Sequence, residues 1–424
     1  MMSVTEFPLP LVGEGQGEGI SIRQRIAARR RSCRKILCTD WGSRFLLASC
    51  LLLQGCTPHL GDSEAALALE DLAAGAFPSR LAAQTPDPER RTVSYLTTPG
   101  ERSADLYQSP EGTLAGIVLV PGAAARGHRD SRVVTVARTL ARLRFAVLVP
   151  DMPGVRQYRV RATDVREVAG AFSWLSERPG LVPEGRIGMA GFSYGAGPVL
   201  VAAMEPDIHA RVRFVMSVGG YYDLHNVIAY FTTGYADTGA ALAIEGAHTA
   251  GLRQPHPYSE SVFIRSNLDL LERSIDRGFL RSYADYLVDS GADMDEPIPG
   301  RLAPDARAFY QLLVNHDPAA VPRLIERLPE RIRHLIEAIN PAAHDLSRLQ
   351  ARLILLHGRS DNLIPYTESV ALSQALPKGQ AQLFLIDGLA HVDLKPKAHD
   401  IPQLIAAMES LLAERASETI ITGE

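Results

Sequence analysis

The stretch that decides the fold is RIGMAGFSYGAG, which runs from Arg186 to Gly197. Its first five residues are typical of a buried strand, and the small residues at its end favour the start of a helix. Between them lies a Gly-x-Ser-x-Gly pattern centred on Ser193. A sharp turn from strand to helix needs glycines beside the serine, because neighbouring backbones crowd there. Free N–H groups at the helix start favour developing negative charge, so the stretch predicts that Ser193 is a nucleophile.

The residues on either side show the same alternation of strand and helix patterns. Segments 116–120, 145–149 and 214–218 are continuous apolar runs, so we expect strands buried on both faces, as in a parallel sheet. Helical spacing of apolar residues occupies 132–143 and 164–175 between them. The alternation predicts an α/β fold with a mostly parallel sheet flanked by helices.

The strand rhythm stops near residue 222 and resumes near residue 345. Between these points the sequence shows helical patterns instead, at 261–287, 304–314 and 323–339. We therefore expect a helical cap inserted into the sheet. The predicted parts of the chain are an N-terminal extension with a signal (1–56), a helix and linker (57–90), the α/β core (91–222 and 345–415) and the helical cap insertion (223–344).

A serine hydroxyl is a poor nucleophile unless a base takes its proton and an acid orients that base. Both partners are found just after predicted strands. Asp361 follows the apolar run 352–356, and His391 follows the run 382–386. The 30 residues that separate them accommodate one helix and one strand. Ser193, Asp361 and His391 are therefore the predicted catalytic residues.

Four motifs together resemble those of the α/β-hydrolases, nearest to the dienelactone hydrolase and prolyl oligopeptidase-like branches. They are Gly191–Gly195, Asn340-Pro341 ahead of a strand, Leu356-His357-Gly358 through Asp361, and Gly388 through His391. The likeness covers about 93–222 and 340–412. It implies the α/β-hydrolase fold, and the family's chain order of serine, acid and histidine agrees with the three residues chosen above.

An oxyanion hole needs two backbone donors aimed at the developing charge. The Tyr194 N–H is the first by position, and the second is expected in the loop after Val120. Many relatives have His-Gly at this point, where this chain has Pro121 and Gly122. Because a backbone donor does not depend on its side chain, we expect the Ala123 N–H to be the second donor, with Ala124 as the alternative.

Three other titratable residues are weighed against these. Asp151 follows a strand but precedes the nucleophile in the chain, so we expect it to shape its loop. His128 follows the loop expected to form the oxyanion hole and is a candidate for substrate contact. For His357, which precedes Gly358, we expect a structural hydrogen bond.

The hypothesis that follows is a serine hydrolase that cleaves a small-molecule carboxylic ester through an acyl-enzyme. A prolyl oligopeptidase-like peptidase is the first alternative, although the chain shows no blade repeats of a propeller domain. A non-catalytic envelope binding protein on the same fold is the second. The motifs imply no metal and no organic cofactor.

The distribution of charge and of cysteines excludes several classes of protein and of site. Residues 1–56 hold eight basic and four acidic side chains, which give this segment a charge of +4. Since the whole chain has a net charge of −4, the rest of it carries −8. That sign excludes an electrostatic footprint for nucleic acid. All four cysteines precede residue 57, which excludes disulfides and cysteine zinc sites within the body.

The N-terminus has the layout of a secretory signal. A basic cluster at 29–35 precedes an apolar run at 45–53, which is too short to span a bilayer. Leu53-Gln54-Gly55-Cys56 resembles the lipobox of bacterial lipoproteins, which implies acylation of Cys56 and a lipid anchor in the membrane. We therefore expect export to the cell envelope, as an outer-membrane lipoprotein. Residues 1–28 show no periodicity and are excluded from the fold.

Overall fold

The computed structural model describes residues 60–97, 100–236, 254–290, 301–391 and 393–416. The N-terminal extension 1–56, with Cys56, lies outside the described residues, so signal and lipidation stay predictions. Within the described ranges, no helix combines the length and apolar character that crossing a membrane requires.

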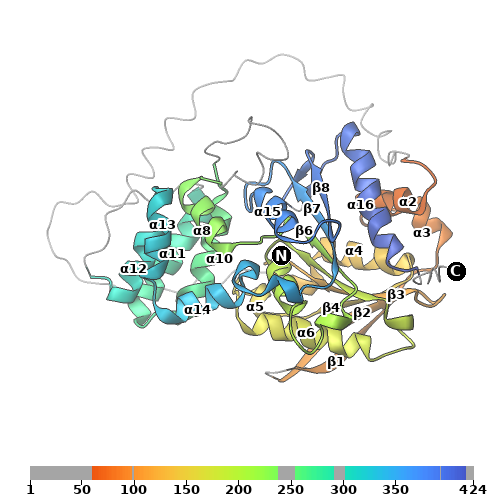
Figure 1. Ribbon diagram of the computed structural model, residues 1–424, viewed down its shortest axis with the longest axis horizontal. Helices are drawn as coiled ribbons and strands as arrows, with labels where there is room; N and C mark the ends of the chain where they lie inside the picture. The colour runs from red at the N-terminus through yellow and green to blue at the C-terminus, as the bar shows by residue number, and fades with distance from the viewer. Residues whose placement is uncertain (1–59, 98–99, 237–253, 291–300, 392, 417–424) are drawn as a thin grey trace, which may run out of the picture. The chain divides into compact units, whose positions relative to one another are not determined.

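The centre of the fold is an eight-stranded sheet in the order β1-β2-β4-β3-β5-β6-β7-β8 (Figure 1). The first two strands pair antiparallel with each other, and β2 pairs antiparallel with β4. All other neighbours run parallel, which confirms the predicted mostly parallel sheet. The strands are β1 (Glu89–Thr97), β2 (Gly100–Gln108), β3 (Ala115–Val120), β4 (Phe145–Pro150), β5 (Ile187–Phe192), β6 (Phe214–Val218), β7 (Arg352–Gly358) and β8 (Ala381–Ile386).

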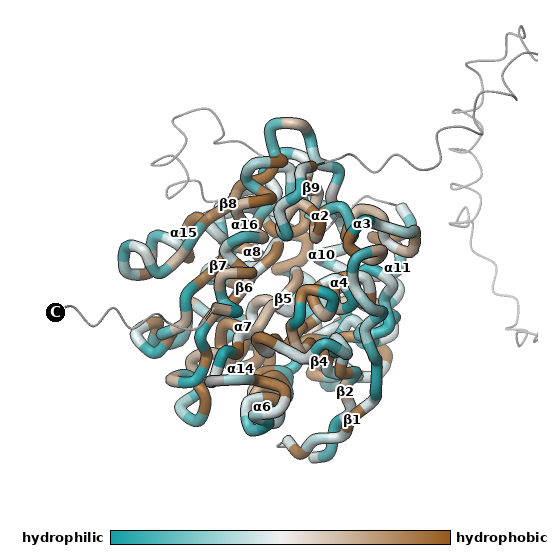
Figure 2. Tube along the Cα trace, turned by 90° about the vertical axis from the view of Figure 1, so that its right-hand side faces the viewer, coloured by the Kyte–Doolittle hydropathy of each residue, from teal (hydrophilic) through white to brown (hydrophobic). Residues whose placement is uncertain are grey.

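Helices cover both faces of this sheet because the strand side chains alternate between two apolar cores. Ile117 and Leu119 of β3 belong to the core under α2, α4 and α16. Val118 and Val120 belong to the core under α6 and α7, on the other face. Figure 2 shows hydrophobic residues both on strands of the sheet and on the helices that cover it. The helices are α2 (Glu64–Ala74), α4 (Ser131–Arg142), α16 (Ile401–Ala413), α6 (Thr163–Ser176), α7 (Ala196–Ala202) and α15 (Thr367–Ala375), with the shorter α3 (Arg80–Gln84) and α5 (Pro153–Arg156).

The chain between β6 and β7 is helical in its described parts, and its helices gather beside one end of the sheet (Figure 1). Two helices predicted as continuous are broken. The stretch 261–287 divides at the turn Leu268–Leu270, where the chain reverses so that α10 and α11 pack together. The stretch 323–339 divides at Pro329, which has no N–H for a continuous helix. The helices are α8 (Leu224–Thr233), α10 (Pro257–Asn267), α11 (Ser274–Ser290), α12 (Pro304–Leu313), α13 (Val321–Glu326) and α14 (Glu330–Ala338).

A buried carboxyl group fixes the point where the chain leaves the sheet for these helices. Glu368 on α15 is 2% exposed, and its Oε2 accepts hydrogen bonds from the N–H groups of Tyr222 (3.1 Å) and Asp223 (2.7 Å). Burial raises the pKa of Glu368 to about 8, although these hydrogen bonds act in the opposite direction. The folded protein therefore holds a proton on Glu368 at pH values where the unfolded chain has lost it.

This proton gives a pH-dependent stability with a defined sign. From the ordinary pKa of 4.5 up to about 8, the folded state binds more protons than the unfolded state at this group, so the free energy of unfolding falls as pH rises. The fall reaches about 1.4 kcal/mol per pH unit, the value for one proton. Urea unfolding between pH 5 and pH 8 should show a smaller loss for Glu368→Gln than for the wild type. Part of the loss stays in the variant, because burial also raises the pKa of Asp164 on α6, to about 7. Glu409→Gln, at an exposed position of α16, should behave as the wild type. Parallel profiles for the wild type and Glu368→Gln would contradict the assignment.

Candidate active site

The three residues selected from the sequence meet at the carboxyl edge of the parallel strands. Ser193 directly follows β5, Asp361 lies in the loop after β7, and His391 follows β9 (Leu389–Ala390). The Ser193 Oγ lies 2.6 Å from His391 Nε2, and His391 Nδ1 lies 2.8 Å from Asp361 Oδ2. With the ring proton on Nδ1, the imidazole donates to the carboxylate and accepts from the hydroxyl. The arrangement allows a proton to pass from the serine to the histidine.

A strained turn presents the serine. Ser193 has φ of 53°, in the left-handed region that residues other than glycine seldom adopt. The glycines beside it permit the close contacts that hold this turn. A Cβ on Gly191 would lie 2.5 Å from the Ala196 Cα, and a Cβ on Gly195 would lie 2.6 Å from the Pro121 carbonyl oxygen. Larger residues at either position would push the turn away from its neighbours.

Asp361 is fully buried and its carboxylate is saturated with donors. Its Oδ1 accepts from the N–H groups of Leu363 (2.8 Å) and Ile364 (3.0 Å). Burial by itself would raise the pKa of Asp361. Hydrogen bonds from His357 and His391 outweigh burial and lower the pKa below its usual range, so the group stays ionised. A fixed negative charge is suited to orient and stabilise a protonated imidazole.

His357 has the structural hydrogen bonds expected of it and one further contact. Its Nδ1 lies 2.7 Å from the Ser369 Oγ, and its Nε2 lies 3.0 Å from the Ile364 carbonyl oxygen. The same Nε2 is 3.3 Å from Asp361 Oδ2, on the carboxylate that His391 contacts. His357 therefore supports the buried acid rather than facing the serine.

The loop before His391 is held by a residue that the sequence analysis did not select. The Asp400 carboxylate accepts from the N–H groups of Asp387 (2.9 Å), Gly388 (2.9 Å) and Lys397 (2.8 Å). His391 itself has φ of 55°, between the short paired strands β9 and β10 (Asp393–Leu394). The sequence shows only an aspartate at the start of a helix, and this pattern is typical of an ordinary N-cap. It therefore does not indicate a role in holding the loop of His391.

The loop after β3 lies against the serine, as predicted for an oxyanion loop. A Cβ on Gly122 would lie 2.9 Å from the Ser193 Cβ, and the next residue, Ala123, lines the same cavity as Ser193. In the described part of the chain, the Ala123 N–H donates to no backbone or side-chain acceptor. The Tyr194 side chain is directed elsewhere, because its hydroxyl donates to the buried Asp164 Oδ2 at 2.5 Å. Burial raises the pKa of Asp164 to about 7.

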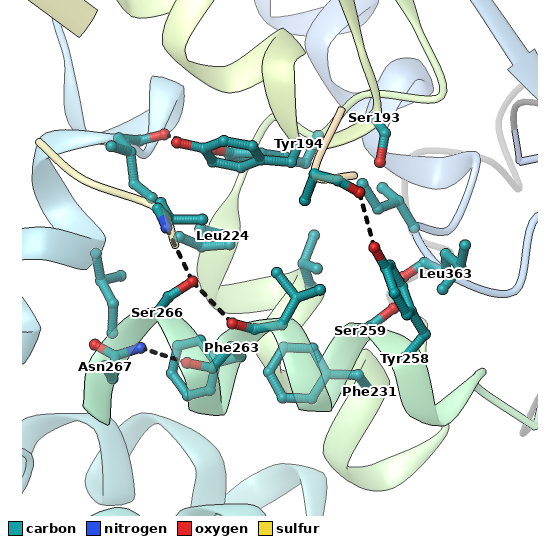
Figure 3. A pocket seen from close by; sticks show the side chains of 18 of the residues that line it. Ser193, Tyr194, Leu224, Phe231, Tyr258, Ser259, Phe263, Ser266, Asn267 and Leu363 are labelled. Carbon is teal, nitrogen blue, oxygen red and sulfur yellow. Dashed lines mark hydrogen bonds between the residues drawn. The ribbon is translucent and has the colours of Figure 1, made fainter. Parts of the chain in front are cut away.

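A cavity of about 740 Å³, including its part open to solvent, begins at Ser193 and His391. Its walls are mostly aliphatic and aromatic side chains from the helices between β6 and β7 (Figure 3). These include Leu224, Val227 and Phe231 of α8, Val262 and Phe263 of α10, and Leu335 and Ile336 of α14. The site therefore combines a polar end, at Ser193 and His391, with an apolar interior.

The remaining candidates lie outside this cavity. His128 is buried, with Nδ1 3.2 Å from Asp151 Oδ1 and Nε2 3.2 Å from the Arg129 Nε. Neither His128 nor Asp151 is among the residues that line this cavity, so substrate contact by His128 stays a prediction that the cavity does not support. Among the described residues, no group of three His, Cys, Asp or Glu side chains is placed to hold a metal ion.

Tyr258 is a further lining residue that sequence reasoning missed. It lies on α10, and its hydroxyl donates to the Ala123 carbonyl oxygen at 2.8 Å (Figure 3). The two residues are 135 positions apart in the chain. No local pattern marks such a contact, because it depends on how the helices between β6 and β7 pack on the sheet.

Residues 117–398 match the family described as alpha/beta hydrolase fold, which is more than half of the chain. Among curated proteins, a segment of 67 residues is 40% identical to a probable isoprenylcysteine alpha-carbonyl methylesterase of Oryza sativa subsp. japonica. This match covers 15% of the chain and spans only 16% of that relative's length.

Solved structures with a similar fold include proteins from bacteria and archaea. An esterase from the archaeon Pyrobaculum calidifontis is 16% identical with a TM-score of 0.43, covering 82% of this chain and 91% of that one. A hypothetical protein from Pseudomonas aeruginosa is 21% identical with a TM-score of 0.41, covering 78% and 95%. A puromycin-hydrolyzing peptidase of Mycobacterium tuberculosis is 16% identical with a TM-score of 0.43, covering 80% and 40%.

One glycine allows the loops of Asp361 and His391 to approach each other. A Cβ on Gly358 would lie 1.8 Å from the Leu389 carbonyl oxygen, which is backbone and cannot rotate away. We expect Gly358→Ala to lower the free energy of unfolding by about 2–3 kcal/mol, the usual cost of overpacking. Gly278→Ala on α11 is the matched control, because nothing lies within 4 Å of its Cβ. It should stabilise the protein by about 0.5–1 kcal/mol, since alanine favours the helix. Equal urea unfolding curves for the two variants would contradict this account.

Proposed function

Because the chain belongs to the alpha/beta hydrolase fold family, we propose that it is a serine hydrolase that cleaves carboxylic esters through an acyl-enzyme. The observation that carries the proposal is the chain of two hydrogen bonds from Ser193 to His391 (2.6 Å) and from His391 to Asp361 (2.8 Å). A hydroxyl, an imidazole and a buried carboxylate in this order are the parts that nucleophilic catalysis by serine requires.

The proposed reaction has two halves. His391 takes the Ser193 proton while the oxygen attacks the ester carbonyl carbon, and the N–H groups of Tyr194 and Ala123 bind the resulting oxyanion. The tetrahedral intermediate collapses, the C–O bond to the alcohol breaks, and His391 protonates the departing alcohol. Water then attacks the acyl-enzyme by the same route, releasing the acid and restoring Ser193. Asp361 stays ionised and stabilises the imidazolium in both halves.

The shape of the cavity favours an elongated apolar group on the ester. The residues of α10 that line it are Tyr258, Ser259, Val262, Phe263, Ser266 and Asn267. They are spaced by one and three residues in turn, so they form one stripe along the helix. From the first to the last, the stripe extends about 13 Å at a rise of about 1.5 Å per residue. An acyl or alcohol group that fills this length is an aliphatic or aromatic chain.

An ester is preferred over a peptide for two reasons. The lining side chains carry no charge to recognise a peptide terminus, apart from His391 at the reactive end. The short match to a probable methylesterase also agrees with an ester substrate. Lipidation at Cys56 and location in the cell envelope remain part of the proposal, on the strength of the sequence pattern in residues 1–56.

Replacing the nucleophile gives the first test. We expect Ser193→Ala to hydrolyse p-nitrophenyl esters at least about 1,000-fold more slowly, because acyl transfer loses its attacking oxygen. It should also lose labelling by a fluorophosphonate probe. Ser282→Ala, at an exposed position of α11, is the matched control and should retain both. A wild-type protein that the probe does not label would favour the binding-protein alternative.

A substrate panel tests the preference for apolar esters. We expect kcat/KM for p-nitrophenyl esters to rise as the acyl chain lengthens from two carbons to about eight, because each added CH₂ group is buried against the apolar wall. Every 1.4 kcal/mol gained by this burial corresponds to about a tenfold rise. Peptide p-nitroanilides, including those with proline before the scissile bond, should be turned over at least about 100-fold more slowly. Faster cleavage of the peptide series would favour the peptidase alternative instead.

A further inference from the structure

We infer that Tyr258, from the helices inserted between β6 and β7, is a positioning residue that holds the oxyanion loop in its active geometry. The inference rests on the proposed function, because it concerns the second oxyanion donor of that reaction. It assigns to the inserted helices a part in rate enhancement in addition to lining the cavity.

The loop after β3 is anchored on one side by the nucleophile turn. A Cβ on Gly122 would lie 3.1 Å from the Phe192 carbonyl oxygen, and a Cβ on Gly195 would lie 2.8 Å from the Val120 carbonyl oxygen. These close approaches fix the backbone as far as Gly122. Beyond it, the orientation of Ala123 depends on the contacts of its own peptide groups.

Tyr258 provides that orientation. Its hydroxyl donates to the Ala123 carbonyl oxygen at 2.8 Å, and the Gly127 N–H donates to the Ala124 carbonyl oxygen at 2.9 Å. Each peptide unit is planar, so the Ala123 N–H and C=O are related by only two soft dihedral angles. With Gly122 fixed on one side and the Ala123 carbonyl held on the other, the direction of the Ala123 N–H is determined.

Tyr258 is itself held in place by the loop that carries Asp361. The His256 N–H donates to the Asn362 carbonyl oxygen at 2.8 Å, and the Ser259 Oγ donates to the Leu363 carbonyl oxygen at 3.0 Å. The His256 side chain caps α10 by accepting from the Tyr258 N–H at 3.1 Å. The first turn of α10 therefore connects the acid loop with the oxyanion loop.

The surroundings keep the hydroxyl protonated and the ring in one position. Burial raises the pKa of Tyr258 well above its ordinary value, so the group remains a donor at neutral pH. The Tyr158 ring packs against it edge to face, with ring centroids 5.9 Å apart. Removing only the oxygen should therefore leave the ring, and the wall of the cavity, unchanged.

Tyr258→Phe tests the inference, assayed with the best p-nitrophenyl ester of the panel. We expect kcat to fall about tenfold, less than the 100- to 1,000-fold typical of losing an oxyanion donor outright, because the Ala123 N–H is misdirected rather than removed. The KM should stay within about twofold. A trifluoromethyl ketone, which forms a tetrahedral adduct with the serine, should bind more weakly by the same factor as kcat/KM falls.

Tyr158→Phe is the matched control, because it removes a hydroxyl from the neighbouring ring, and it should match the wild type in all three measurements. Thermal unfolding within about 2 °C of the wild type verifies that Tyr258→Phe is folded. An unchanged kcat, or a raised KM at unchanged kcat, would overturn the inference while leaving the hydrolase intact. Failure of the probe to label the wild-type protein would instead contradict the proposed function itself.

Discussion

The hydrogen bond between Ser193 and His391 sets the strictest requirement on the rest of the structure. The two atoms lie 2.6 Å apart although their residues are 198 positions apart in the chain. Meeting that distance requires the carboxyl ends of β5, β7 and β8 to lie at the same edge of the sheet, which the parallel direction of these strands provides. It also goes with left-handed backbone at both Ser193 and His391, so local strain is found at both residues. Strands buried between helices on both faces of the sheet keep this strain in place.

The sequence predicted the parts of this arrangement that depend on local pattern. The strand at 214–218 was predicted with the bounds that the structure has, because a continuous apolar run is a local signal. The Gly-x-Ser-x-Gly pattern selected Ser193, and the positions after predicted strands selected Asp361 and His391. The structure brings these side chains together. Their catalytic roles are still a proposal.

What the sequence did not predict depends on contacts between distant segments. Two helices within the insertion were expected to be continuous and instead break at Leu268–Leu270 and at Pro329. The first break follows from the packing of α10 on α11, and the second from the missing N–H of the proline. Asp400 and Tyr258 have no unusual local pattern, so their support of the His391 loop and of Ala123 became visible only in three dimensions. A tyrosine on a helix predicts burial, and nothing more specific.

The apolar core of the sheet continues into the inserted helices. A single continuous cluster joins Val118 and Phe172, under the sheet, to Phe309 and Ile332, among the inserted helices. Because the two parts share this cluster, we expect them to melt as one cooperative unit rather than as separate modules. Exchanging these helices with those of another family member would therefore disturb the sheet as well. Recombination should preserve the fold only when the whole shared core is carried over.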